Sequence, residues 1–367
     1  MDKIRILYVL ASLDICNGMV SYSMNYFRKI NKEKFQVDFI ISSNKESPYY
    51  DEIRSSGSNI YVMPELKLNN AYKLSNELNN FFKNNKYHII HCHLANVGAL
   101  YLKYAKKHNI GVRILHSHAT KSADKIIKKI RNNILIPFSK FYANYYFACS
   151  EDAGKYMFGK DKFNIVKNAI DLDKFIFNEQ KRKEKRLELG ITEKFVVGNV
   201  GRLSPQKNPL FMLDIFYEIQ RMKDNAILLL IGDGPMEVEV NNKIIDMGLE
   251  KKVILLSDRT DIAEIYNAMD VFVLPSIYEG LGIVYIEGQA SGLKCFGSDK
   301  VPIEARISSL MNFIELKENH KVWAKKIVNV DKENNRIDNL SEVMSSGYNI
   351  NNEIKKLEEL YLSLLKE

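Results

Sequence analysis

The chain alternates short apolar runs with longer segments whose apolar residues recur at helical spacing. Apolar runs of four to seven residues are typical of strands that are buried on both faces of a parallel sheet. The alternation predicts an α/β fold of two Rossmann-like, doubly wound halves with a cleft between them. The predicted strands are Ile4–Leu10, Val37–Ile41, Asn59–Met63, His88–His91, Val112–Leu115 and Tyr145–Cys149, then Val196–Asn199, Ala226–Ile231, Val253–Leu256 and Val271–Leu274.

The domain boundary is expected near the middle of the chain. At 367 residues the chain is long enough for about two domains of ordinary size. Asn168–Asn178 is rich in turn residues, and the charged run Gln180–Glu188 follows it, so we expect the linker here. We therefore expect an N-terminal domain over residues 1–170, a second domain over 171–345 and a helix over 346–367.

The net charge of +8 indicates anionic partners, namely phosphates, an anionic membrane surface or nucleic acid. The aromatic residues show no stacking pattern, which argues against nucleic acid. No apolar run approaches the roughly 20 residues of a membrane span. The start of the chain carries Asp2 and no clear cleavage site, so it reads as a first strand rather than a signal peptide. The four cysteines are far apart without a CxxC pair, so reduced thiols and a cytoplasmic location are expected.

The stretch Pro275–Ser298 carries the strongest chemical signal. Glu279 and Glu287 stand with seven residues between them around a turn at Gly280 and Gly282. A predicted strand precedes the turn and a helix follows it, so the backbone N–H groups of residues 281–283 form a candidate anion site. The less specific alternative is that Glu279 caps the helix and Glu287 is a solvated helix residue.

Two cations follow the first strand of the second half. Arg202 comes directly after Gly201, and Lys207 lies five residues further on. A planar fork of donors beside a mobile point charge suits a diphosphate, although both residues could be solvated surface charges. Gly232–Pro235 is a tight turn that we interpret as structural, and neither a P-loop nor a dinucleotide fingerprint is present. Arg259 follows another strand and either borders a base or is an exposed loop arginine.

The first half offers a glycine and two histidine pairs. Gly18 lies in the loop after the first strand, where its backbone either approaches a ligand or forms a plain turn. His91 and His93 end one strand, and His116 and His118 end the next. We expect no metal site, because neighbouring strand residues point to opposite faces and no further ligand is evident.

The segments GRLSPQKNP, IGDGP and PSIYEGLGIVYIEGQASGLKCFGSD together resemble the retaining glycosyltransferases of family 4. The resemblance is to the exopolysaccharide and capsular-polysaccharide branch and covers nearly the whole chain. The two glutamates match the family's E-x7-E motif. The resemblance implies a GT-B fold, with the donor bound mainly by the C-terminal domain and the last helix packed back on the N-terminal domain.

The resemblance also implies residue roles. Arg202 and Lys207 would hold the donor diphosphate, while Glu287 would bind the ribose and Glu279 the transferred sugar. Of the histidines, His118 best matches the one that contacts the donor sugar, with His116 as the alternate, and His93 matches a structural or acceptor-side position. The family often has two adjacent glycines near Gly18, where this chain has Asn17, which weakens that assignment. The expected catalytic residues are His118, Glu279, Arg202 and Lys207, and the expected donor-binding residues are Gly18, Gly201, Arg202, Lys207, Arg259, Glu279, Gly280, Leu281, Gly282, Ile283 and Glu287.

The expected activity is transfer of a sugar from a UDP-sugar to a growing polysaccharide or lipid-linked acceptor, with retention and without metal or cofactor. Related alternatives are a glycogen-synthase-like enzyme, a sugar-phosphate-forming transferase and a non-catalytic nucleotide-sugar-binding module. The stretch Lys121–Lys140 places isoleucines between lysines. It would either rest on an anionic membrane or form a solvated helix packed on its domain.

Overall fold

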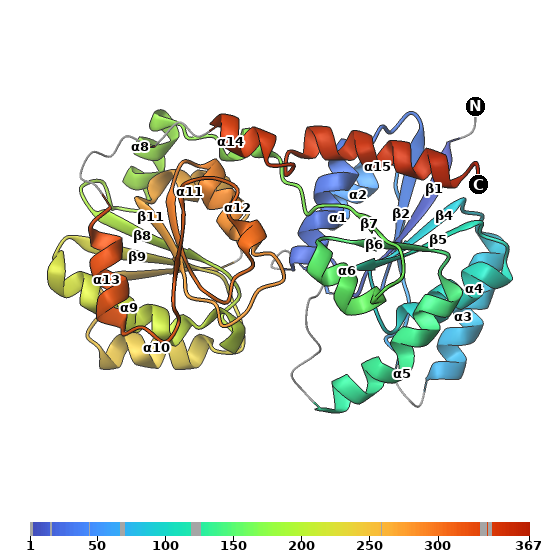
Figure 1. Cartoon of the computed structure of the whole chain (residues 1–367), viewed down its shortest axis with the longest axis horizontal. Helices are drawn as coiled ribbons and strands as arrows, with labels where there is room; N and C mark the ends of the chain where they lie inside the picture. The colour runs from blue at the N-terminus through green and yellow to red at the C-terminus, as the bar shows by residue number, and fades with distance from the viewer. Residues whose placement is uncertain are drawn as a thin grey trace. The chain divides into compact units, whose positions relative to one another are not determined.

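The computed structural model describes residues 3–14, 17–43, 45–66, 70–118, 126–257, 259–330, 336 and 340–367. Two compact units divide the chain (Figure 1). Unit 1 comprises Met1–Ala169 together with Ile350–Glu367, and unit 2 comprises Ile170–Asn349. The chain therefore leaves unit 1, builds the whole of unit 2, and returns to unit 1 for its last helix.

Unit 1 is a parallel sheet covered by helices on both faces. Its described strands pair in the order β3-β2-β1-β4-β5-β6-β7. This order runs outward in both directions from β1 and β4, so the switch point of the sheet lies between them. The strands are β1 (Ile4–Val9), β2 (Phe35–Ile41), β3 (Ile60–Val62), β4 (Ile89–Cys92), β5 (Val112–Ser117), β6 (Tyr145–Ala148) and β7 (Asn164–Ile165).

The helices of unit 1 bury two separate apolar layers. Because alternate residues of a strand face opposite sides, Ile6 and Tyr8 belong to one layer, whereas Leu7 and Val9 belong to the other. The first layer includes α1 and α15, and Figure 1 shows α15 lying along this side of unit 1. The helices are α1 (Gly18–Lys29), α2 (Tyr49–Ser55), α3 (Ala71–Asn84), α4 (Gly98–Lys107), α5 (Ile126–Tyr142), α6 (Glu151–Phe158) and α15 (Ile350–Leu364).

Unit 2 repeats the architecture with its own sheet, and its described strands pair in the order β10-β9-β8-β11-β12-β13. The switch point here lies between β8 and β11. The strands are β8 (Phe195–Val200), β9 (Ala226–Ile231), β10 (Val253–Leu256), β11 (Val271–Leu274), β12 (Lys294–Ser298) and β13 (Met311–Ile314). Its helices are α7 (Leu172–Phe175), α8 (Glu179–Glu188), η1 (Pro205–Lys207), α9 (Pro209–Met222), α10 (Glu237–Asp246), α11 (Ile262–Ala268), α12 (Ile283–Ala290), η2 (Ile303–Ala305), α13 (His320–Val328) and α14 (Leu340–Ser345).

The alternation predicted from the sequence is confirmed, and the charged run Gln180–Glu188, which follows the turn-rich stretch at the expected boundary, is helical. It forms most of helix α8, which belongs to unit 2. Arg182 and Arg186 of this helix pair with the buried carboxylate of Asp270 at 2.5 and 2.6 Å. A run that looks solvated in the sequence is therefore fixed against the sheet by a buried acidic partner.

Candidate functional site

The site in unit 2 is built on the two strands that flank the switch point. Lys207 ends the turn η1 after β8, and Glu279 lies in the loop after β11. The Lys207 Nζ and Glu279 Oε1 atoms are 2.5 Å apart, and the Ser276 hydroxyl donates to the same carboxylate oxygen at 2.6 Å. Glu279 is only 6% exposed. Two residues that are distant in sequence thus form a partly buried ion pair where open α/β sheets bind ligands.

The backbone of the two loops is connected as well. The Ile277 N–H donates to the Gln206 carbonyl at 2.8 Å, and the Gln206 side chain donates to the Tyr278 carbonyl at 3.1 Å. The hydroxyl of Ser298, at the end of β12, donates to the carbonyl of Ser276 at 2.5 Å. The positions of Lys207 and Glu279 are therefore determined by three neighbouring strands rather than by one loop.

Gly282 is the N-cap of α12 and adopts the left-handed conformation, with φ of 81°. A β-carbon at this position would lie 2.6 Å from the ring of Tyr285, so glycine is required both for the backbone and for space. The first N–H groups of a helix have no intrahelical acceptor. The start of α12, at Ile283, therefore presents backbone N–H donors and the positive end of the helix dipole close to Glu279 in the chain.

Glu287 lies on α12, where it is half-buried. The Tyr266 hydroxyl donates to its Oε2 at 3.1 Å. Burial raises the pKa of Glu287 to about 7, and the tyrosine hydrogen bond opposes that shift. The alternative that Glu287 is a solvated helix residue is therefore wrong.

The other predicted site residues of unit 2 differ in their surroundings. Arg202 is exposed beside Gly201 and makes no ion pair within the part of the chain that the structure describes. Arg259 instead binds the carboxylates of Asp261 and, at 3.3 Å, Glu188. The guanidinium of Arg259 and then the ammonium of Lys185 lower the pKa of Asp261 to about 2. The structure thus groups Lys207 with Glu279 and holds Arg259 in a separate ionic network.

The turn Gly232–Pro235 supports the backbone beside Arg202. A β-carbon on Gly232 would lie 2.2 Å from the carbonyl oxygen of Gly201, and one on Gly234 would lie 2.3 Å from that of Leu203. The Leu203 N–H donates to the Asp233 carbonyl at 2.6 Å. These contacts agree with the structural interpretation of the turn.

In unit 1, Gly18 is the first residue of α1, and the Asn17 side chain caps that helix by accepting from the Met19 N–H at 3.0 Å. A β-carbon on Gly18 would meet nothing within 4 Å, so the fold of unit 1 does not itself require glycine at this position. Asn17 therefore acts as the N-cap of α1.

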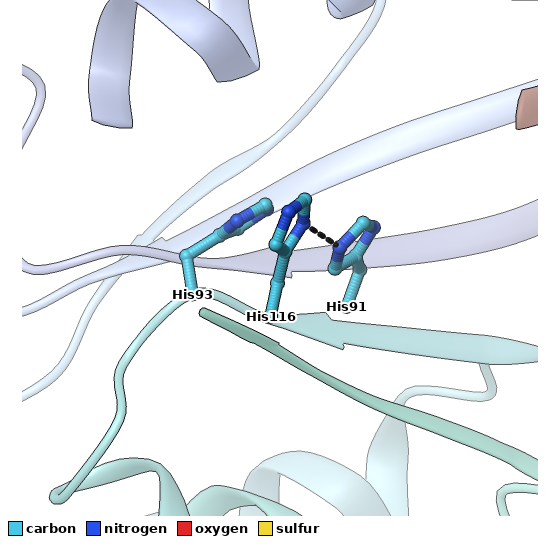
Figure 2. Close-up of side chains that lie close together, drawn as sticks. All are labelled: His91, His93 and His116. Atoms are coloured by element: carbon cyan, nitrogen blue, oxygen red, sulfur yellow. Dashed lines mark hydrogen bonds between the residues drawn. The ribbon is translucent and has the colours of Figure 1, made fainter. Parts of the chain in front are cut away.

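The two histidine pairs of unit 1 form one cluster on a single face of the sheet. His91 and His93 come from β4 and its end, and His116 and His118 from the adjacent strand β5 and its end. The expectation that these residues point to opposite faces is wrong, because residues two apart on a strand share a face. His91, His93 and His116 are at most 1% exposed, and three of their ring nitrogens lie within 4.8 Å of one another (Figure 2).

The rings of this cluster meet as two edge-to-edge pairs. The His91 Nε2 and His116 Nδ1 atoms are 2.9 Å apart while the ring centroids are 5.1 Å apart, so the two nitrogens point toward each other (Figure 2). The His93 Nδ1 and His118 Nε2 atoms lie 2.8 Å apart in the same manner. The geometry of both contacts is that of N–H···N hydrogen bonds. Burial lowers the pKa of all four imidazoles, that of His118 to about 3.

The cluster is anchored by the last helix. The Tyr361 hydroxyl of α15 is 2.6 Å from the His91 Nδ1 atom and 3.2 Å from the Tyr8 hydroxyl. Sequence reasoning missed this cluster, although the H-x-H spacing in two successive strands would have revealed it. It also missed Tyr361, whose polar partner lies 270 residues away.

The two parallel-sheet Rossmann-like units, each with candidate ligand residues at the carboxyl ends of its strands, form a fold of the GT-B class. Residues 16–174 match the family Glycosyltransferase Family 4, and residues 181–343 match Glycosyl transferases group 1. The chain is 31% identical over 334 residues to a Bacillus subtilis (strain 168) protein named glycosyltransferase EpsF, covering 88% of this chain and 86% of that protein. The chain therefore belongs to the glycosyltransferases of family 4, and its second half matches the group 1 model.

Two further similarities extend over almost the whole chain. An Escherichia coli protein named UDP-Gal:alpha-D-GlcNAc-diphosphoundecaprenol alpha-1,3-galactosyltransferase is 28% identical, with 99% of this chain and 98% of that protein covered. The crystal structure of Anabaena Alr3699/HepE in complex with UDP and glucose superposes with a TM-score of 0.79 at 15% identity, covering 98% of this chain and 100% of that one. The latter establishes the fold.

Proposed function

We propose that this protein is a retaining, metal-independent hexosyltransferase that moves a sugar from a UDP-sugar to a hydroxyl of a growing cell-surface polysaccharide or lipid-linked saccharide. The observation that carries the proposal is the partly buried Lys207–Glu279 ion pair at the switch point of the unit 2 sheet. The HepE structure, with its bound UDP and glucose, supports the donor class. The name of the Escherichia coli relative, which specifies a diphosphoundecaprenol-linked sugar, supports the acceptor class.

The donor diphosphate would bind the cations of the β8 loop. Arg202, which is exposed, and Lys207 supply charge-assisted hydrogen bonds, and the first-turn amides of α12 add further donors. When the diphosphate arrives, it competes with Glu279 for Lys207. The Glu279 carboxylate then accepts hydrogen bonds from hydroxyls of the transferred sugar, and Glu287 accepts from the ribose hydroxyls.

The proposed reaction proceeds on one face of the donor sugar. The bond from the anomeric carbon to the diphosphate oxygen breaks, and a bond from the same carbon to the acceptor oxygen forms on the same side. The acceptor hydroxyl proton passes to the leaving diphosphate, so no protein base is needed. Lys207, Arg202 and the α12 amides stabilise the negative charge that grows on the diphosphate.

Variants of the two charged positions test the assignment. We expect folded Glu279→Ala and Arg202→Ala proteins to lose about a hundredfold or more in kcat/KM, because both act on groups whose charge or contacts change in the transition state. Asp214→Ala, which removes a surface partner of Lys243, is the control. NMR of the product anomer tests retention, and full turnover with excess chelator tests metal independence. Wild-type rates in both variants would refute the site.

Two alternatives remain separable by assay. A non-catalytic module would bind UDP-sugars but turn over none of them with any acceptor. A glycogen-synthase-like or sugar-phosphate-forming enzyme would act on a glucan or a sugar phosphate in preference to a lipid-linked saccharide. A panel of nucleotide sugars in calorimetry, followed by turnover of the best binder with each acceptor, distinguishes all three.

We further propose that unit 1 rests on the inner, anionic face of the cell membrane through α5. Ile134, Phe138 and Phe141 recur at helical spacing on this helix and are 57%, 52% and 67% exposed. The helix buries its other side, with Ser139 fully buried and Ile136 and Tyr142 packed against the core. Five lysines and arginines lie within residues 121–131, of which 121–125 are outside the described residues. An apolar stripe that follows a basic run in the sequence suits an anionic lipid surface.

Vesicle sedimentation tests this contact. We expect the protein to bind vesicles that contain anionic lipid, to be released by salt, and to lose binding in a Phe138→Ser, Phe141→Ser double variant. The exposed Tyr72 on α3 provides a control, since Tyr72→Ser should bind like wild type. Equal binding to neutral vesicles, or full binding by the double variant, would refute the proposal. None of the described helices is long and apolar enough to cross a bilayer.

A further inference from the structure

Arg336 is a partly buried arginine of unit 2 that lies outside the predicted site. Its guanidinium lies over the ring of Phe177, 4.4 Å from the ring centroid. Burial lowers the pKa of this guanidinium to about 9, so its surroundings oppose the charge. A buried charge is costly unless its N–H groups are paired, so the partners of Arg336 indicate what the residue is for.

The guanidinium connects the C-terminal ends of two helices. Its Nη2 atom donates to the carbonyls at the end of α11, those of Tyr266, Asn267 and Met269, at 2.8, 2.8 and 2.7 Å. Its Nη1 atom donates to the carbonyl of Ser291, the C-cap of α12, at 2.5 Å. The last carbonyls of a helix have no intrahelical donor and carry the negative end of the dipole, so a cation is favourable there. One rigid, planar group thus joins α11 to α12.

Glu287 lies between these contacts. Its carbonyl accepts from the Ser291 N–H at 3.0 Å, and its carboxylate accepts from the Tyr266 hydroxyl at 3.1 Å. Arg336 therefore reaches Glu287 by two routes, through Ser291 to its backbone and through Tyr266 to its side chain. The contacts form a closed ring, so a shift of α11 along α12 would break either a bond of the guanidinium or the tyrosine–carboxylate bond.

Arg182 offers a matched comparison at the end of α11. It donates to the carbonyls of Asn267 and Met269 at 3.0 and 2.7 Å, and it pairs with Asp270 at 2.5 Å. None of the bonds that it makes with the described residues reaches α12. Arg186 also pairs with Asp270, at 2.6 Å, so this carboxylate would keep a cation if Arg182 were replaced. The two arginines at this helix end thus differ in whether they bridge to the helix of Glu287.

We propose that Arg336 is a positioning residue that holds α11 against α12, so that Tyr266 aims the Glu287 carboxylate at the ribose hydroxyls of the bound nucleotide. The inference rests on the proposed function, in which Glu287 accepts hydrogen bonds from the ribose. It adds the device that sets the orientation of this carboxylate, and every residue of that device belongs to unit 2. The preference for a ribonucleotide over a deoxyribonucleotide then depends on Arg336, although Arg336 does not itself contact the nucleotide.

Calorimetry with UDP and with 2′-deoxy-UDP measures this preference without turnover. We expect the wild type to bind UDP about tenfold or more tightly than 2′-deoxy-UDP, because a hydrogen bond to a carboxylate is lost with the 2′-hydroxyl. In Arg336→Met the ratio of the two affinities should fall to about threefold or less, mainly through weaker binding of UDP. Arg182→Met is the control, since it should lower the stability of unit 2 toward urea and leave the ratio unchanged.

A double-mutant cycle tests the route through the tyrosine. Tyr266→Phe should lower the UDP preference by the same factor as Arg336→Met. The variant that carries both changes should show no further loss, because both changes act on the same tyrosine–carboxylate bond. Where Arg336→Met does not fold, Arg336→Lys replaces it in these measurements, because lysine keeps the charge and lacks the planar fork.

Each result bears on a separate step of the inference. A wild-type affinity ratio in the Arg336 variant would overturn the positioning role. An equal fall in Arg182→Met would show general loosening of unit 2 and would also overturn it. Additive losses in the double variant would exclude the route through Tyr266. Failure of the proposed function shows differently, because the wild type itself would then bind no UDP or would bind UDP and 2′-deoxy-UDP equally well.

Discussion

The four neutral histidines of unit 1 predict that mild acid selectively destabilises this unit. Burial lowers the pKa of His91, His93 and His116 well below the ordinary value of 6.5, and that of His118 to about 3. Below pH 6.5 the unfolded chain therefore binds more protons than the folded chain. The stability contributed by the neutral histidines is fully present above pH 6.5 and is lost as the pH falls.

The size of the effect follows from linkage. A histidine that stays neutral in the folded state reduces the free energy of unfolding by about 1.4 kcal/mol between about pH 7.5 and about pH 5.5. Four such groups sum to about 5 kcal/mol, which is a large part of the stability of an ordinary domain. The opposite sign holds for Glu287 in unit 2, whose pKa is raised to about 7. Its contribution grows as the pH falls from 7 toward its ordinary value of 4.5.

The two units can be followed separately. The chain contains one tryptophan, Trp323, which is fully buried on α13 of unit 2. Tryptophan fluorescence during urea unfolding therefore reports unit 2, while far-UV circular dichroism reports both units. The dichroism change that has no counterpart in fluorescence belongs to unit 1. We expect acid to shift the midpoint of this change to a lower urea concentration.

A variant provides the quantitative check. His118→Gln removes one titrating group. Between about pH 7.5 and about pH 5.5, its free energy of unfolding should therefore fall by about 1.4 kcal/mol less than that of the wild type. A dichroism transition that does not move with pH would refute the reasoning. The reasoning would also be refuted if the variant and the wild type lost the same free energy of unfolding in acid.

Three further predictions concern single contacts. Lys207→Met should weaken UDP binding by about tenfold to a hundredfold in calorimetry, since a charge-assisted hydrogen bond is lost, and unchanged affinity would contradict the diphosphate site. Gly234→Ala should destabilise unit 2 by about 3 kcal/mol in the fluorescence assay, because the new β-carbon meets a backbone oxygen at 2.3 Å. Gly248→Ala, with positive φ but open space, should cost only about 1 kcal/mol, and equal losses would contradict the steric argument. Tyr361→Phe should lower the stability of unit 1 by about 1–3 kcal/mol by dichroism, because it leaves a buried imidazole nitrogen unpaired, and no loss would contradict the hydrogen bond.

The sequence predicted elements best where hydrophobic burial alone decides them. The fully buried strands β9 and β11 are nearly continuous apolar runs, and both were predicted with their observed bounds. Strand β12, Lys294–Ser298, was missed because a lysine and a glycine interrupt its short apolar pattern. Helix α8 was not predicted as a helix, because the acidic partner of its arginines, Asp270, lies more than 80 residues away.

In the candidate site, too, the sequence identified single residues but not the contacts that depend on the fold. Motif spacing identified Lys207 and Glu279, but not that they pair directly, since the pairing depends on β8 and β11 being neighbours in the sheet. The histidines were identified one by one and missed as a cluster. Their interaction required the register of β4 with β5 and a tyrosine from the last helix.

The return of the chain to unit 1 has a consequence for biosynthesis. The core of unit 1 includes Leu357 and Tyr361 of α15, which leave the ribosome after all of unit 2 has been made. Unit 2 is one uninterrupted segment and can fold as soon as it emerges, whereas unit 1 has an incomplete apolar layer until α15 has been made. The usual order, in which the N-terminal domain matures first, is thus reversed in this chain. A nascent chain stalled before residue 350 should hold a protease-resistant unit 2 beside a protease-sensitive N-terminal half.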